Sequence, residues 1–315
     1  MTPPTPAVGR LARWAGGPAT VRRRALNRVL LLVPVPTRRR AQYLLAHGRP
    51  LHLSRPQRWS EKINWRMVHD RRALIAMTCD KQAAREYAAA TVAPGSLRFP
   101  RTVWCGDDPA ALTELSWPAR WVFKSNHGTG AVVMGEGHPD PQRVADLVDL
   151  GRRWLTDRGP ERWGEWGYGQ ARRLLMVEEA IPGTTPSGLA DHKFFVADGE
   201  VRLVQVDTDR FTRHRRRFHT PTWEPLDAVC EVPLAPVAPA PPHLAEMLAV
   251  ATRLGAAFDF IRVDLYDAAG GVWFGELTAY SGSGLAPLRP TALDDELGAA
   301  WTLPRLDRSG ARLLA

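Results

Sequence analysis

The chain has 315 residues, 44% of them hydrophobic, so it can bury one large core or two or three small lobes, and disorder is not expected. Lys and Arg number 42 against 33 acidic residues, and the resulting net charge of +9 and pI of about 10.1 favour anionic partners. Cys79, Cys105 and Cys230 have no paired spacing, which argues against a disulfide framework or a zinc site and fits a reducing cytoplasm.

Residues 1–44 are predicted to form a basic, partly mobile N-terminal arm. The arginine triplets 22–24 and 38–40 flank an apolar stretch, 29–35, that is far shorter than the roughly 20 residues needed to cross a bilayer. The stretch also lacks a small-residue cleavage site, so we do not expect a cleaved signal peptide. A solvated leader is the favoured interpretation. Weak contact with an anionic membrane surface is the alternative, and it would place the protein at the inner face of a membrane.

Helices and short strands are predicted to alternate after residue 45. The periodicity indicates helices over 74–90, 141–156 and 244–257, and buried strands over 121–124, 131–134 and 174–179. Hairpins are expected over 192–206, with a turn at 197–199, and over 260–278, after a Pro-rich link at 232–242. This mixture predicts an α+β or α/β fold, and the chain contains no internal repeat.

A glycine-containing turn joins the strands 121–124 and 131–134. Its residues are Lys124, Ser125, Asn126, His127, Gly128, Thr129 and Gly130. The backbone N–H groups of such a turn can wrap phosphates, and Lys124 would add a point charge. Turns of this kind also join strands without binding a ligand, so both interpretations stay open at this point. The sequence matches neither a Walker A loop nor a dinucleotide fingerprint.

The hairpin 260–278 is predicted to carry ionisable side chains on one face. If its turn has three residues, Asp264 lies opposite Glu276 and Arg262 lies opposite Thr278, whereas a two-residue turn would shift the pairing by one. Two carboxylates about 5 Å apart repel unless a cation lies between them. Asp264, Glu276 and Thr278 are therefore candidate Mg²⁺ ligands. The alternative is a solvent-exposed face on which Asp264 pairs with Arg262.

Two further strands carry candidate contacts to a nucleotide. Glu178 and Glu179 close a buried strand, where a backbone edge and a carboxylate could meet an adenine amino group and ribose hydroxyls; an ordinary strand end is the alternative. Asp191 and Lys193 flank His192 at a spacing of two and share one strand face. Lys193 could reach a phosphate or acyl-phosphate oxygen, with a surface salt bridge as the alternative.

These motifs occur in the order seen in ATP-grasp ligases. The motifs are Asp80-Lys81, the Lys124 loop, Glu178-Glu179, Asp191-His192-Lys193, Arg262-Val263-Asp264 and Gly275-Glu276-Leu277-Thr278. More closely, the stretches 59–65, 78–87, 274–278 and 281–284 resemble the TupA-like ATP-grasp family, named for teichuronopeptide synthesis, over roughly residues 45 to 300. Six motifs in one order are far more specific than any one of them.

The resemblance implies an ATP-grasp fold of the α+β class, with an N-terminal lobe at 45–118 and ATP held between an ATP-grasp lobe at 119–210 and a C-terminal lobe at 211–315. The implied ATP-binding residues are Lys81, Lys124, Ser125, His127, Gly128, Thr129, Gly130, Glu178, Glu179, Ala180, Ile181, Asp191 and Lys193. The implied Mg²⁺ ligands are Asp264, Glu276 and Thr278. Related ligases have Asn at the third position, and Thr is a weaker neutral oxygen ligand.

The implied reaction joins a carboxylate to an amine. The carboxylate attacks the γ-phosphoryl group of ATP to give an acyl phosphate and ADP, and the amine then displaces phosphate. Mg²⁺, Lys81 and Lys124 would neutralise charge, with Lys193 and Arg262 as the catalytic residues. The basic run 213–217 would attract an acidic acceptor at the cleft mouth, or else form a solvated loop.

The resemblance also implies a biological context, the synthesis of cell-surface polysaccharides or peptide polymers, or of secondary metabolites. The substrates would be small or polymer-linked acids and amines, and no nucleic acid is expected because no recognised nucleic-acid motif occurs. Three alternatives remain open from the sequence. They are an ATP-dependent phosphotransferase, a glycosyltransferase or polysaccharide-assembly protein that uses a nucleotide sugar, and a basic binding protein with a degenerate site.

Overall fold

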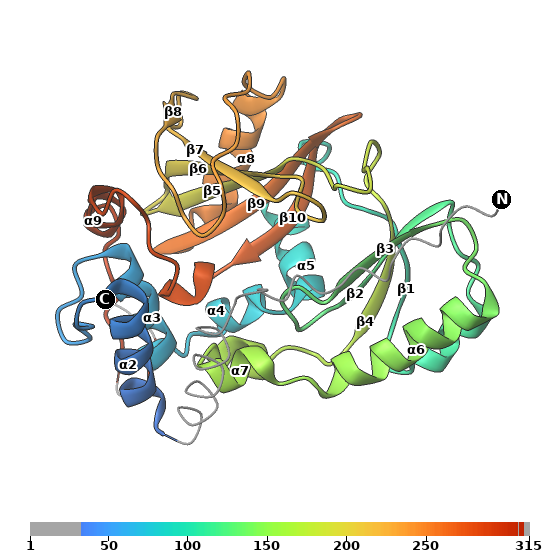
Figure 1. Ribbon diagram of the computed structural model, residues 1–315, viewed down its shortest axis with the longest axis horizontal. Helices are drawn as coiled ribbons and strands as arrows, with labels where there is room; N and C mark the ends of the chain where they lie inside the picture. Colours follow the sequence, from blue (N-terminus) through green and yellow to red (C-terminus); the bar gives the residue numbers. More distant parts are fainter. Residues whose placement is uncertain (1–32, 308, 312–315) are drawn as a thin grey trace.

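The computed structural model describes residues 33–307 and 309–311 (Figure 1). The helices are α2 (Val35–His47), α3 (Trp59–His69), α4 (Ala73–Thr78), α5 (Lys81–Thr91), α6 (Pro141–Thr156), α7 (Gly159–Trp163), α8 (Leu244–Gly255) and α9 (Ala292–Ala299), with 3-10 turns η1 (Pro109–Glu114), η2 (Trp166–Gly169) and η3 (Ser281–Gly284). The strands are β1 (Thr102–Gly106), β2 (Arg120–Ser125), β3 (Val132–Glu136), β4 (Leu175–Glu179), β5 (Asp191–Ala197), β6 (Glu200–Thr208), β7 (Arg215–His219), β8 (Pro225–Leu226), β9 (Phe260–Ala268) and β10 (Gly271–Thr278).

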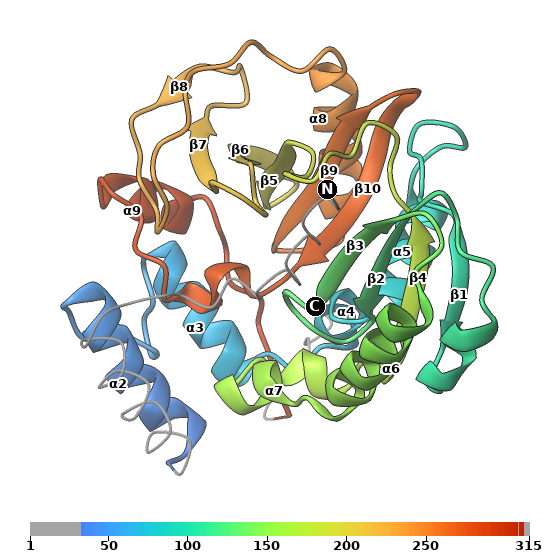
Figure 2. The same cartoon turned by 45° about the vertical axis from the view of Figure 1, so that its right-hand side comes forward.

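The strands form two antiparallel sheets that lie next to each other in both views (Figures 1 and 2). The smaller sheet has the order β1-β4-β2-β3, and the larger has the order β10-β9-β5-β6-β7-β8. Helix α6 covers the smaller sheet, while α8 packs on β5, β6 and β9 of the larger one. Antiparallel sheets with helices on their faces confirm the predicted α+β class.

Each sheet has its own hydrophobic core. In the smaller core, Phe123 stacks on Trp154 of α6 with ring centroids 5.1 Å apart. The larger core joins the six-stranded sheet to α3, α4, α5, α8 and α9. Strands β5 and β6, placed by prediction in the lobe 119–210, thus share a core with helices from the lobe 45–118. The predicted division into three lobes stays a prediction. The lobes are ranges of the sequence, whereas each hydrophobic core contains residues from more than one of these ranges.

Most predicted elements are present within a few residues of their expected bounds, but the predicted helix over 74–90 is two helices, α4 and α5. The helix is interrupted at Asp80, whose backbone is extended. The Asp80 side chain is the N-cap of α5 and accepts a hydrogen bond from the Ala83 N–H at 2.9 Å. The same carboxylate binds Arg172 at 2.8 Å, so a contact distant in sequence holds the break.

Helix α2 contains the last ten residues of the predicted N-terminal arm. Arg39 is fully buried and donates to Asn64 Oδ1 at 2.7 Å, to Gln42 Oε1 at 3.1 Å and to the Ser283 carbonyl. Arg38 is also buried, so the triplet 38–40 is largely an internal anchor and not a solvated charge run. The triplet 22–24 lies outside the described residues. Within the described part of the chain, no helix combines the length and apolar character that crossing a bilayer requires.

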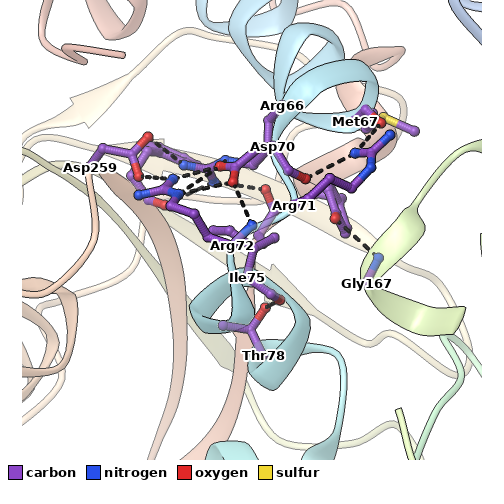
Figure 3. A network of polar contacts seen from close by, with 12 residues as sticks. Arg66, Met67, Asp70, Arg71, Arg72, Ile75, Thr78, Gly167 and Asp259 are labelled. Atoms are coloured by element: carbon purple, nitrogen blue, oxygen red, sulfur yellow. Dashed lines mark hydrogen bonds and ion pairs between the residues drawn. The ribbon is translucent and has the colours of Figure 1, made fainter. Parts of the chain in front are cut away.

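A buried ion network ties α3 and α4 to the start of β9 (Figure 3). Asp259 binds Arg66 at 2.7 Å and Arg72 at 2.6 Å, and Arg72 also binds Asp70 at 2.6 Å. All four side chains are less than a tenth exposed. Because β9 carries Arg262 and Asp264, this network fixes the hairpin of β9 and β10 against helices α3 and α4.

The hairpin of β9 and β10 has the predicted pairing but a different turn. Asp264 lies opposite Glu276 and Arg262 lies opposite Thr278, which confirms the predicted pairs. The predicted three-residue turn is wrong, because the turn has only the two residues 269–270. The shorter turn alone would displace the pairing by one residue. A register shift between Phe274 and Glu276 on β10 restores it.

Gly275 is the extra residue of this β-bulge. A Cβ added at Gly275 would lie 2.7 Å from the Asp264 carbonyl oxygen and 3.0 Å from the Tyr266 ring. The backbone oxygen cannot move without disturbing the hairpin, so only glycine fits. The bulge therefore sets the position of Glu276 relative to Asp264.

Replacing Gly275 by Ala is expected to destabilise the protein by about 1–3 kcal/mol, because the new methyl group overpacks the bulge. Urea unfolding would measure the loss. Gly159→Ala is a matched control, because a Cβ at Gly159 meets only the mobile end of Asp157, at 3.2 Å. An unchanged unfolding midpoint for Gly275→Ala would contradict this account of the bulge.

Candidate active site

A cleft of about 640 Å³ lies between the two sheets, within the size range of ligand pockets. The predicted site residues that line it are Lys81, Lys124, Gly128, Thr129, Gly130, Glu178, Glu179, Ile181, Asp191, Arg262, Asp264, Glu276 and Thr278. The predicted residues Ser125, His127, Ala180 and Lys193 do not line it. Segments from β2 to β10 thus converge on one space, as the predicted ATP site requires.

The loop 128–130 offers unused backbone donors to the cleft. Asn126 anchors the loop: its side chain accepts the Gln82 N–H and donates to the Arg172 carbonyl, both at 2.9 Å. Lys81 Nζ donates to the Gly128 carbonyl at 2.6 Å. The N–H groups of 128–130 donate to no acceptor in the described structure. These N–H groups and Lys81 can therefore bind phosphate oxygens.

Ser125 and His127 lie behind this loop and support it. His127 is buried, and its Nε2 lies 3.0 Å from the Trp154 carbonyl oxygen. Ser125 is also buried, and its Oγ occupies the space that a Cβ at Gly128 would enter. Both side chains point away from the ligand side, which the sequence of a loop does not specify.

Lys124 and Glu178 form an ion pair across neighbouring strands of the smaller sheet. Lys124 Nζ lies 2.6 Å from Glu178 Oε2, and Arg85 lies 3.7 Å from the other oxygen. Glu179 pairs with Arg101 at 2.6 Å and is partly exposed. Glu178 therefore orients Lys124 toward the cleft, whereas the Glu179 carboxylate is held near the surface.

The end of β4 offers one free backbone donor to a base. The Ala180 N–H donates to the Arg120 carbonyl at 3.0 Å and is not available. The Ile181 N–H makes no hydrogen bond with any described residue, and Ile181 lines the cleft beside Val122, Met134 and Phe274. An apolar slot with one edge donor fits an adenine ring.

Asp264 is held in a chain of ion pairs at the floor of the cleft. It accepts two hydrogen bonds from Arg262, both at 2.7 Å, and one from Lys193 at 2.6 Å. Lys193 also binds Asp191 at 2.5 Å, which in turn binds Arg210 at 2.5 Å. Burial opposes the charge of Asp191, but Lys193 and Arg210 keep its pKa below the ordinary value. Lys193 lies beneath Asp264 and acts on the cleft through it.

The opposed acids Asp264 and Glu276 both have side-chain cations as partners, so the cation that relieves their repulsion need not be a metal. Asp264 pairs with Arg262, as in the alternative interpretation, but it is buried and not solvent-exposed. Arg262 and Lys193 neutralise Asp264, while Lys81 lies 4.0 Å from Glu276. Burial lowers the pKa of Arg262, but Asp264 outweighs this effect and raises it. Glu276, which is partly exposed, is the acid with capacity left for another cation.

A buried carboxylate absent from the predictions, Glu165, lines the cleft beside η3. Its Oε1 accepts a hydrogen bond from Ser283 Oγ. Ser283 and both glycines flanking it, 282 and 284, have positive φ near +55°, a run that brings the Ser283 side chain and carbonyl to Glu165 and Arg39. Burial raises the pKa of Glu165 to about 7.

A family comparison identifies the chain. The model of the family described as TupA-like ATPgrasp matches residues 61–302, most of the sequence. The chain belongs to the TupA-like ATPgrasp family. This confirms the predicted family and its ATP-grasp fold.

Solved structures similar to this TupA-like ATPgrasp protein include ATP-grasp ligases. The ATP-grasp ligase PsnB, complexed with minimal precursor, is 15% identical, with 72% of this chain and 62% of that chain covered and a TM-score of 0.38. The D-alanine-D-alanine ligase from Helicobacter pylori is 10% identical, with coverages of 71% and 58% and a TM-score of 0.41. The chain spans about 60% of the length of these solved chains. No curated protein matches it.

ATP and Mg²⁺ are the cofactors of ATP-grasp ligases, and PsnB has been solved with Mg and ADP. The residues of this TupA-like ATPgrasp protein fit both. Mg²⁺ is usually held by one or two carboxylates plus phosphate oxygens. Asp264 and Glu276 provide such a pair, and no cluster of three or more His, Cys, Asp or Glu is found in the described structure. Thr278 Oγ1 already accepts a hydrogen bond from Arg262 at 3.0 Å.

Arg210, Tyr266 and Glu165 were missed by the sequence predictions, although all three line the cleft. Arg210 comes just before the basic run 213–217, of which Arg216 binds Asp207 at 2.6 Å as a structural partner. The sequence around Glu165 shows only that a single acidic residue lies between aromatic and glycine residues over 163–169. Such a signal does not distinguish a site residue from a core residue.

Replacing Glu165 by Gln is expected to stabilise this TupA-like ATPgrasp protein at high pH. The pKa of Glu165 is raised from 4.5 to about 7, so folding favours the protonated acid, and stability falls as the pH rises from about 4.5 to 7. Gln lacks this titration. The variant should exceed the native protein by roughly 3 kcal/mol at pH 8 and match it at pH 4. Urea unfolding across this pH range tests the expectation, and a difference independent of pH would contradict it.

Proposed function

We propose that this protein is an ATP- and Mg²⁺-dependent ligase that joins a carboxylate to an amine through an acyl phosphate. The observation that carries the proposal is the convergence on one cleft of three sets of groups. These are the free N–H groups of 128–130 with Lys81 and Lys124, the opposed acids Asp264 and Glu276, and Arg262 between those acids and η3.

The nucleotide end would use groups of the smaller sheet. The Ile181 N–H would bind the adenine edge, and the N–H groups of 128–130 would hold the phosphates together with Lys81 and Lys124. Asp264 and Glu276 would hold Mg²⁺, which would neutralise the charge that develops on the phosphate groups. Lys193 would balance the charge of Asp264 from below and would not itself contact phosphate.

The reacting end would lie over the hairpin and η3. Arg262 donates to Thr278 and to Ser281, both at 3.0 Å, and lines the cleft beside them. A guanidinium fixed in this way can stabilise the oxyanion that forms when the amine attacks the acyl phosphate. Positioning and charge neutralisation would then supply most of the rate, as in other phosphoryl transfers.

The substrates are proposed to be small or polymer-linked acids and amines. Membership of the TupA-like ATPgrasp family supports the synthesis of cell-surface polysaccharides or peptide polymers, or of peptide-like secondary metabolites. The basic surface of the chain, with a net charge of +9, would attract acidic substrates.

ADP release tests the proposal. The protein would be incubated with ATP and Mg²⁺ against panels of carboxylic acids, alone and with amines, and products would be identified by mass spectrometry. We expect ADP release to depend on an acid and to yield an amide when an amine is added. A stable phosphorylated product without an amide would point to a phosphotransferase and contradict the ligase. Hydrolysis of a nucleotide sugar without ATP would also contradict it.

A further inference from the structure

Glu165 lies buried at the end of the cleft formed by η2, η3 and the hairpin. Its side chain is 6% exposed, yet it lines the cleft together with Tyr168, Tyr280 and Ser283. One carboxylate oxygen accepts from Ser283 Oγ, and the other has no hydrogen-bond partner in the described structure. The free oxygen is therefore available to a ligand in the cleft.

Glu165 forms no ion pair with any described residue. Arg39 is the cation that acts on it electrostatically, but the Arg39 guanidinium is already bound to Asn64, Gln42 and the Ser283 carbonyl. Burying a carboxylate without a cationic partner is unfavourable. The buried or partly buried acids elsewhere in the cleft, such as Asp264, have cationic partners, and the one lining acid without an ion pair in the described structure, Asp157, is exposed to solvent. An unpaired acid facing a binding cleft indicates that the cation comes with the substrate.

We propose that Glu165 binds the amino group of the amine substrate and accepts its proton as the amine attacks the acyl phosphate. This inference rests on the proposed ligase function and names its second substrate as a primary amine that is protonated in solution. Three aromatic residues, Trp163, Tyr168 and Tyr280, also line the cleft, and aromatic rings attract cations.

The step balances without a further reactant. The ammonium group first loses one proton to solvent, and the neutral amine keeps a hydrogen bond to Glu165. Its lone pair then forms the C–N bond at the acyl carbonyl, and the C–O bond to phosphate breaks, with the electron pair leaving on phosphate. The second amine proton moves to the Glu165 carboxylate, which returns it to solvent after product release.

The surroundings of Glu165 suit this exchange. Burial raises its pKa to about 7, where a general base is most effective. The Ser283 hydrogen bond and the charge of Arg39 on α2 lower it, and Glu276 on β10 raises it. Cys79 and Tyr168 also face Glu165, and burial keeps both protonated at neutral pH.

Hydroxylamine separates this role from the earlier steps. It is neutral at pH 7 and attacks an acyl phosphate without a base, giving a hydroxamate that is easily measured. Full-length protein, ATP, Mg²⁺ and a panel of carboxylic acids would be assayed with hydroxylamine. The acids that respond would then be assayed with a panel of primary amines for the amide. The same assays would be run on Glu165→Gln and on Glu161→Gln, a control in the adjoining α7 that does not line the cleft.

We expect Glu165→Gln to form hydroxamate at the native rate and to lose amide formation by at least about 100-fold. Glu161→Gln should retain both. In the native protein, amide formation should rise with pH through about 7 as Glu165 loses its proton, while hydroxamate formation should lack this dependence. Glu165→Gln is expected to fold, because it removes a buried charge that has no cationic partner in the described structure. Its amide formation should lack the step near pH 7, which separates the titration of Glu165 from the deprotonation of the amine itself.

Three results would overturn the proposal. Equal losses of hydroxamate and amide in a folded Glu165→Gln would assign the residue to structure or nucleotide binding. Native amide formation by that variant would remove the residue from the reaction. If the native protein forms no hydroxamate from any acid, the ligase function itself fails, and the role of Glu165 fails with it.

Discussion

Replacing Glu276 by Gln should reduce Mg²⁺-dependent ADP release at least about 100-fold. Asp264 shares its oxygens with Arg262 and Lys193, so Glu276 would supply most of the negative charge that the pair offers to a metal. Gln keeps the shape of the side chain but removes its charge, which weakens the hold on Mg²⁺ and misplaces the phosphates. A second measurement needs no acid or amine. A nonhydrolysable ATP analogue with Mg²⁺ should raise the melting temperature of the native protein, and this rise should be smaller in Glu276→Gln.

Glu200→Gln is a matched control for this prediction. Glu200 belongs to the same sheet, is well exposed and pairs with Arg202 at the surface at 2.8 Å. The Glu200→Gln variant should therefore show the same ADP release and the same nucleotide-induced rise in melting temperature as the native protein. The metal assignment would fail if Glu276→Gln kept native Mg²⁺ dependence, or if the two variants lost activity equally.

Replacing Asp259 by Asn should lower the free energy of unfolding by about 3–5 kcal/mol. Asp259 binds Arg66 at 2.7 Å and Arg72 at 2.6 Å (Figure 3). It also accepts a hydrogen bond from the Trp301 indole N–H at 2.7 Å. Removing its charge leaves two buried guanidinium groups without their shared partner. Urea unfolding at pH 7 measures the loss.

The same network predicts a dependence on pH. Burial raises the pKa of Asp259, but Arg66 and Arg72 outweigh it and hold the pKa below the ordinary value. The stabilisation is therefore complete above about pH 4 and is lost as the pH falls further. Asp295→Asn is the control, because Asp295 is half exposed and its pair with Arg58 at 2.8 Å is worth at most about 1 kcal/mol. Equal losses in the two variants would contradict the assignment.

Many residues that line the cleft could be found from the sequence because their signals are local. The period of two in 260–266 placed Arg262 and Asp264 on one face, and glycines between two short strands marked the loop 128–130. The predicted pairing of Asp264 with Glu276 is confirmed, but the three-residue turn that was predicted to produce it is wrong. A two-residue turn and a bulge at Gly275 give the same pairing as the predicted three-residue turn. Two compensating shifts of one residue leave no trace in the hydrophobic pattern.

The rest depended on contacts between segments distant in the chain. Sequence spacing cannot say that His127 faces the core behind its loop, or that Lys193 is covered by Asp264. It also cannot reveal that the arginine triplet 38–40 is drawn inside by partners on α3 and η3.

The family, the α+β class and the order of the candidate site residues could all be inferred from the sequence alone, because these follow from motifs and local periodicity. Which side chains face the cleft, how its acids are neutralised, and the lack of a cationic partner for Glu165 among the described residues became clear only from the packing of the chain. Burial and charge compensation are properties of the packed molecule. They arise only when elements far apart in the chain are brought within a few ångströms of one another.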